Sequence, residues 1–182
     1  SVADMMIRTQ SDRMTGKNGS WHIELDGISQ ETALKIAERD DVVSIGAVTI
    51  FNPDGELPYR MDGKRVVLYG IDESYLTMNS TGAAEGRFPQ GMGEIMLSSN
   101  AARVLQVAVG DTVTLRTPSG DWDFTVSGLG GVEESYYSGQ YSLMDAYLPR
   151  TAFAALMEQN NVHNLQTSYY VQFTSASKAA KA

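Results

Sequence analysis

The alternation of apolar and polar residues near the start of the chain predicts a strand, a helix and a second strand. Trp21, Ile23 and Leu25 alternate with polar neighbours, a pattern typical of a strand with one buried face. Ser29 stands where its hydroxyl can cap a helix, and the first turn after it carries an acidic residue. Residues 42–51 are rich in β-branched side chains, which predicts a buried strand.

Turn signals divide the middle of the chain into shorter pieces. A turn at 52–55 predicts a meander, which leads to a short helix capped by Asp72. Glycines recur in the region that follows. Within it, residues 112–116 and 122–129 show the alternation of a β-hairpin.

These patterns predict an α+β fold with two lobes. Residues 17–85 and 140–182 are expected to form one α+β lobe, and residues 86–139 a smaller β-rich lobe inserted into it. Residues 1–16 are predicted to form a short amphipathic helix, because their apolar residues recur at helical spacing.

The net charge of the chain argues against nucleic acid as a partner. Its 182 residues include 22 acidic and 14 basic side chains, for a formal net charge of −8. This charge would repel a phosphate backbone, and the lysines and arginines are scattered along the sequence, so nucleic acid is not expected as a partner. The chain has no cysteine, which excludes disulfides, thiolate metal sites and cysteine nucleophiles.

Candidate catalytic chemistry is sparse. His22 is expected at the surface on the polar face of its strand and His163 in a loop, and neither has a second ligand at metal-binding spacing. Ser175 and Lys178 match the Ser-x-x-Lys spacing of serine acyl-transferring enzymes, but a pattern this short arises often by chance. We therefore expect no metal site, no cofactor in this domain and no enzymatic activity.

Three tyrosines are the residues at which contact with a partner or substrate is most expected. Tyr136, Tyr137 and Tyr141 cluster beside the polar, glycine-containing segment 130–139. Exposed tyrosines suit a recognition surface, because they add contact area with little loss of conformational entropy. Packing of the same side chains between the two lobes would explain the cluster equally well.

A series of short patterns, taken in order, resembles one family. The series includes Leu68-Tyr69-Gly70-Ile71-Asp72, Glu85-Gly86-Arg87-Phe88-Pro89, Gly93-Glu94-Ile95-Met96-Leu97-Ser98, Val109-Gly110-Asp111-Thr112-Val113 and Tyr147-Leu148-Pro149. Each pattern alone is common, so the likeness depends on their order and spacing. From about Trp21 to Ala182 the chain resembles the extracytoplasmic core domain of MacB/FtsX-type ABC transporter permeases.

The resemblance implies a domain on the extracytoplasmic side of the cell membrane that relays ATP-driven motion of membrane helices. The larger lobe would be the porter-like lobe of that family, and residues 1–16 a stalk that continues a membrane helix. The implied partners are a cytoplasmic ATPase subunit, reached through the membrane part of the same protein, and a second permease subunit. A peptide, a lipoprotein or an antibiotic would be the substrate, or another extracytoplasmic molecule the partner.

Two other functions stay open at this stage. A stand-alone extracellular module would bind a peptide or a glycan through the tyrosine cluster. A hydrolytic enzyme is suggested only by the pattern Ser175-Ala176-Ser177-Lys178.

Overall fold

The predicted strand, helix and strand near the start of the chain are confirmed. A computed structural model of the protein describes residues 5–10, 19–51, 58–79, 83–131 and 144–175, together with Lys178. In it, β2 (Ile23–Asp26), α2 (Gln30–Ala37) and β3 (Val42–Phe51) follow one another. Ser29 caps α2, because its hydroxyl accepts a hydrogen bond from the Thr32 N–H at 3.1 Å.

The other elements are short strands and helices that alternate along the chain. In chain order they are β1 (Met6–Thr9), β4 (Arg60–Met61), β5 (Lys64–Ile71), α3 (Glu73–Asn79), β6 (Ala83–Gly86), β7 (Glu94–Leu97), α4 (Ser99–Leu105), β8 (Thr112–Thr117), β9 (Gly120–Gly130), β10 (Met144–Pro149), α5 (Arg150–Gln159) and β11 (Leu165–Phe173). The predicted α+β class is confirmed. None of the helices described here is long and apolar enough to cross a bilayer.

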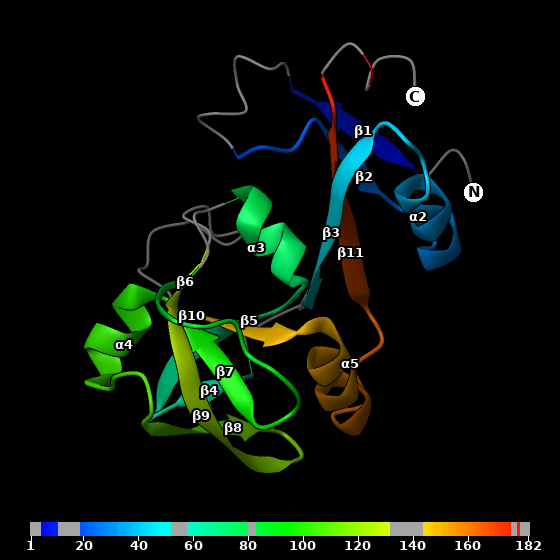
Figure 1. The fold of residues 1–182 in the computed structure, drawn as a ribbon. Helices are drawn as coiled ribbons and strands as arrows, with labels where there is room; N and C mark the ends of the chain where they lie inside the picture. The colour runs from blue at the N-terminus through cyan, green and yellow to red at the C-terminus, as the bar shows by residue number, and fades with distance from the viewer. Residues whose placement is uncertain are drawn as a thin grey trace.

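One continuous sheet organises the molecule and closes on itself at one end. Its strand order is β1-β2-β11-β3-β5-β10-β7-β9-β8-β4, and β4 pairs back with β5. Six strands, β5, β10, β7, β9, β8 and β4, therefore form a small closed barrel, and β1, β2, β11 and β3 form an open sheet attached to it. In Figure 1 the long strands β3 and β11 rise from the barrel towards β1, β2 and α2.

The barrel and the open sheet have separate apolar cores. The barrel is filled by inward side chains such as Val66, Leu115 and Leu148, and α5 closes against it through Phe153. The open sheet is covered on one face by α2, over a core that includes Ala47. Its other face packs against α3 in a third cluster, which also includes side chains of the barrel strands such as Tyr69 and Tyr147.

Two glycines let helices approach the strands closely. A Cβ added at Gly46 of β3 would lie 2.3 Å from the backbone nitrogen of Tyr75 in α3. A Cβ added at Gly70 of β5 would lie 2.6 Å from the ring of Phe153 in α5. Neither position therefore has room for a larger side chain, and both helices sit directly on the sheet.

The predicted helix at the start of the chain is corrected by the structure, while the predicted division into lobes stays a prediction. Met6–Thr9 is a strand that pairs with β2, not part of a helix. The edge of β2 offers backbone partners that the spacing of apolar residues does not reveal. Residues 1–4 and 11–18 lie outside the described part. The division into lobes at residue 86 stays a prediction. The sheet crosses the predicted boundary between the lobes, since β10 pairs with β5 and β7, and β4 pairs with β5 and β8.

Candidate functional site

The three tyrosines of the predicted contact surface lie outside the described residues. Tyr136, Tyr137 and Tyr141 fall between β9 and β10. At the edge of this segment, a Cβ added at Gly131 would lie 2.5 Å from the ring of Tyr147, so the chain leaves β9 against that ring. The role of Tyr136, Tyr137 and Tyr141 in partner contact stays a prediction.

The two histidines occupy different environments. His22 is buried, not at the surface as predicted, and its Nδ1 accepts a hydrogen bond from the Phe173 N–H at 3.1 Å. The pairing of β2 with β11 places it inside, which the alternation along one strand did not reveal. His163 is exposed, with Nε2 2.9 Å from Oδ1 of Asn161. Among the described residues, no group of three or more histidines and carboxylates is placed to hold a metal ion.

A shallow pocket opens on the face of the open sheet, beside α3. Its volume is about 220 Å³. Side chains from β1, β2, β3 and β11 line it: Met6, Arg8, Glu24, Asp26, Val48, Ile50, Gln166 and Ser168. The pocket thus combines an apolar wall with two carboxylates and one guanidinium.

Glu24 is the most unusual residue of this pocket, because its carboxylate is buried. The residue is only 2% exposed. Oε1 accepts a hydrogen bond from the Tyr170 hydroxyl at 3.0 Å, and Oε2 pairs with Arg8, whose side chain is 62% exposed. Burial raises the pKa of Glu24 above its usual value, and the bonds from Tyr170 and Arg8 oppose that rise.

The ion pair between Arg8 and Glu24 stabilises the pairing of β1 with the sheet. Arg8 lies opposite Glu24 in the register of β1 and β2, so the ion pair adds to the backbone hydrogen bonds of a four-residue strand. Next to it, Oδ1 of Asp26 is buried without a hydrogen-bond partner in the described part of the chain. A displacement of β1 would therefore expose or strain a buried carboxylate.

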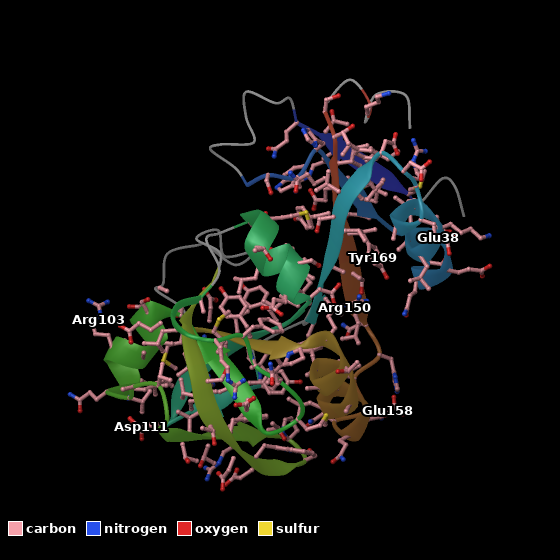
Figure 2. All side chains as sticks on the ribbon, in the orientation of Figure 1. Glu38, Arg103, Asp111, Arg150, Glu158 and Tyr169 are labelled. Atoms are coloured by element: carbon pink, nitrogen blue, oxygen red, sulfur yellow. The ribbon has the colours of Figure 1, made fainter. Side chains whose placement is uncertain are left out.

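A second polar cluster joins the open sheet to the barrel. Oδ2 of Asp72, between β5 and α3, accepts hydrogen bonds from the Ala47 N–H at 2.9 Å and from Nη1 of Arg150 at 3.3 Å. The guanidinium of Arg150 lies 5.5 Å from the centre of the Tyr169 ring. Figure 2 shows Arg150 and Tyr169 together where β3 and β11 meet the barrel.

Sequence reasoning missed this cluster. Asp72 was expected to cap a helix, but its carboxylate bonds to residues 25 and 78 positions away in the chain. No local pattern marks such a contact, because it depends on how β3 and α5 are brought together by the sheet. We refer below to Asp72, Ala47, Arg150 and Tyr169 as the junction cluster.

Comparisons with known proteins agree with the fold. The model of the MacB-like periplasmic core domain matches residues 1–182. The periplasmic region of MacB from Actinobacillus actinomycetemcomitans superposes with a TM-score of 0.56 at 14% identity, over 97% of this chain and 78% of that one. A domain of a putative permease from Porphyromonas gingivalis gives 0.51 at 17% identity, over 78% of this chain and 66% of that one. No curated protein sequence matches.

Proposed function

Because the chain belongs to the family of MacB-like periplasmic core domains, the extracytoplasmic domains of ABC transporter permeases, we propose that it relays motion across the membrane. In this proposal, ATP-driven movement of membrane helices is passed through the domain to a substrate or partner outside the membrane. A cytoplasmic ATPase subunit and a second permease subunit would act with it, through the membrane part of the same protein.

The observation that carries the proposal is the way the first and last strands enter the sheet. β1 and β11 both pair with β2, and β11 also pairs along its length with β3. β3 then pairs with β5, which belongs to the barrel. A displacement of either strand would therefore reach the barrel through backbone hydrogen bonds and through the junction cluster.

The test uses the full-length permease with its ATPase subunit in lipid. These 182 residues contain no cysteine, so Val109→Cys gives the domain one site for a spin label, in the loop between α4 and β8 where Val109 is 39% exposed. Two labelled subunits then report one distance across the dimer. We expect this distance to change between the nucleotide-free and the ATP-trapped states, measured by double electron–electron resonance.

The junction cluster provides the matched variants. Asp72→Asn weakens the bond to Arg150, and we expect it to reduce the change in distance while ATP hydrolysis is retained. Asp40→Asn, at an exposed turn after α2, is the control and should behave like the native protein. A distance that does not respond to nucleotide in the native protein would contradict the relay. A normal response in Asp72→Asn would contradict the path through this cluster.

The family is one of transporter domains and not a known enzyme class. That this chain catalyses no reaction, and that it needs no cofactor, both stay predictions. Ser175 accepts a hydrogen bond from the Lys178 N–H at 3.4 Å, which is a local turn contact and gives no support to a hydrolytic role.

A further inference from the structure

Asp26 stands in a cross-strand row of side chains that lines the pocket on the open sheet. In the register of the sheet, Asp26 of β2 lies between Met6 of β1 and Ser168 of β11, and Ser168 is opposite Val48 of β3. Directly opposite residues of antiparallel strands share a face of the sheet, so these four side chains line one surface. Val48 also belongs to the cluster that packs against α3, which places the row on the α3 side of the open sheet.

Asp26 carries a negative charge that no basic side chain in the described part of the chain pairs with directly. Two carboxylates and one guanidinium line the pocket, and the guanidinium of Arg8 hydrogen-bonds to Glu24. Arg8 attracts Asp26 at longer range, but the neighbours of Asp26 in the register, Met6 and Ser168, are uncharged. The described lining therefore carries one net negative charge, because two of its side chains are acidic and one is basic.

One oxygen of the Asp26 carboxylate also lacks a hydrogen bond. Oδ1 is buried and has no hydrogen-bond partner among the described residues. A buried acceptor without a donor costs free energy, which a bound donor would recover. Met6 lies directly across from Asp26 and is 62% exposed, and its unbranched side chain can shift to admit a donor from the pocket.

The size and the apolar wall of the pocket limit what can bring this donor. Its volume of about 220 Å³ lies below the roughly 300–1,000 Å³ of sites for drug-sized ligands. A cavity of about 150 Å³ holds benzene, so the pocket has room for a short aliphatic group. Met6, Val48 and Ile50 offer such a group an apolar surface. A calcium ion would instead need about six or more oxygen ligands, and no set of three acidic or histidine side chains within the described ranges is placed to hold an ion.

We propose that the pocket binds a primary alkylammonium group. The ammonium donates hydrogen bonds to the Asp26 carboxylate and supplies the missing positive charge, because it carries one charge and three N–H donors. The alkyl stem lies against Met6, Val48 and Ile50. This site goes beyond the proposed relay and does not depend on it, since the open sheet alone provides the binding residues.

The first experiment titrates the 182-residue chain with n-butylammonium chloride at neutral pH and low ionic strength. Binding is followed by NMR of the methyl groups of Met6, Val48 and Ile50 and of the carboxyl carbon of Asp26. We expect saturable shifts at these residues with a dissociation constant of about 1–10 mM, because so small a ligand makes few contacts. n-Butanol, which has the same stem and no charge, and sodium chloride are the control ligands, and neither should produce saturable shifts.

The variants separate the charge from the apolar wall. Asp26→Asn keeps the shape of the side chain and removes its charge, so it should weaken butylammonium binding about tenfold or more, which corresponds to about 1.4 kcal/mol. Asp40→Asn is the matched control and should bind like the native protein, because it makes the same change at an exposed turn after α2, the helix on the opposite face of the open sheet.

Met6→Gln tests the apolar wall at an exposed position. It should reduce the preference for butylammonium over methylammonium and leave methylammonium binding unchanged, because only the longer stem reaches the wall. Circular dichroism shows whether each variant is folded. If Asp26→Asn does not fold, Met6→Gln and the comparison of butylammonium with n-butanol still test the site.

Two peptide probes identify the source of the amine. One is a blocked tripeptide with a central lysine, and the other is the same peptide with that lysine acetylated. Shifts at the pocket residues with the first peptide and not with the second would assign the group to a lysine side chain. Shifts with butylammonium and with neither peptide would assign it to a small soluble amine. Equal binding of n-butanol and butylammonium, no saturable shift with any amine, or equal effects of Asp26→Asn and Asp40→Asn would overturn the proposal.

Discussion

Asp145 should destabilise the folded protein at neutral pH, and its replacement by asparagine should remove that effect. The residue lies on β10, where its backbone carbonyl accepts a hydrogen bond from the Ser98 N–H at 2.9 Å. Oδ1 of its carboxyl group is buried and lacks a hydrogen-bond partner in the described part of the chain. Burial raises the pKa of Asp145 from 3.8 to about 6, against the opposing effect of a hydrogen bond from Tyr69.

The magnitude follows from linkage between protonation and folding. The folded state holds the proton more tightly than the unfolded state, so this contribution to stability is fully present below about pH 4 and is lost as the pH rises to about 6. The rise of the Asp145 pKa from 3.8 to about 6 corresponds to about 3 kcal/mol in the free energy of unfolding. Because Asp145 is partly exposed, solvent screening lowers this figure, and we expect about 1–3 kcal/mol.

The assay is urea unfolding of the native protein and of Asp145→Asn at about pH 4 and about pH 7.5. We expect the variant to gain stability relative to the native protein on going to the higher pH. Asp40→Asn, at an exposed turn, is the control for removal of one negative charge. Equal differences at both pH values, or an NMR titration of the Asp145 carboxyl with a midpoint near its usual value, would refute the reasoning.

Two other substitutions test the packing and polar contacts described above. Tyr170→Phe removes the hydroxyl that donates a hydrogen bond to the buried carboxylate of Glu24, so we expect the free energy of unfolding to fall by about 1–3 kcal/mol at neutral pH. An unchanged unfolding midpoint in urea would contradict this expectation. Gly70→Ala places a methyl group against the ring of Phe153 and should lower the free energy of unfolding by about 1–3 kcal/mol in the same assay. Gly93→Ala, where the added atom meets open space, is its control, and equal effects of the two would contradict the close-packing argument.

Local patterns predicted the elements that local interactions determine. Ser29 caps α2 as predicted, because a cap needs only the next three residues. The hairpin of β8 and β9 was predicted for the same reason. The closure of the barrel by β4 was not predicted, because β4 pairs with a strand more than fifty residues later and only the folded sheet brings them together.

The candidate sites were much less visible in the sequence. The alternation of Trp21, Ile23 and Leu25 placed Glu24 on the polar side of its strand. In the fold, Tyr170 of β11 and Arg8 of β1 bond to its carboxylate, and the residue is buried. The placement of Arg60 opposite Arg116 in the sheet shows the same limit. The sequence separates Arg60 from Arg116 by 56 positions, and only the register of three strands makes them neighbours.

The shared strand β5 determines how a movement could pass between the two halves of the molecule. Six residue pairs join it to β10 within the barrel, but only three pairs join it to β3, from Val48 to Ile50. The open sheet itself is held more firmly, since β3 and β11 pair along nearly their whole length. Bending is therefore expected at the β3–β5 seam before either half deforms. The bond from the Ala47 N–H to Asp72 crosses this seam, and so does the contact of Arg150 with the Tyr169 ring. The bond from Arg150 to Asp72 joins these two contacts on the barrel side. In the proposed relay, the junction cluster would therefore set whether the domain transmits a displacement of β1 as a rigid body or absorbs it as a hinge.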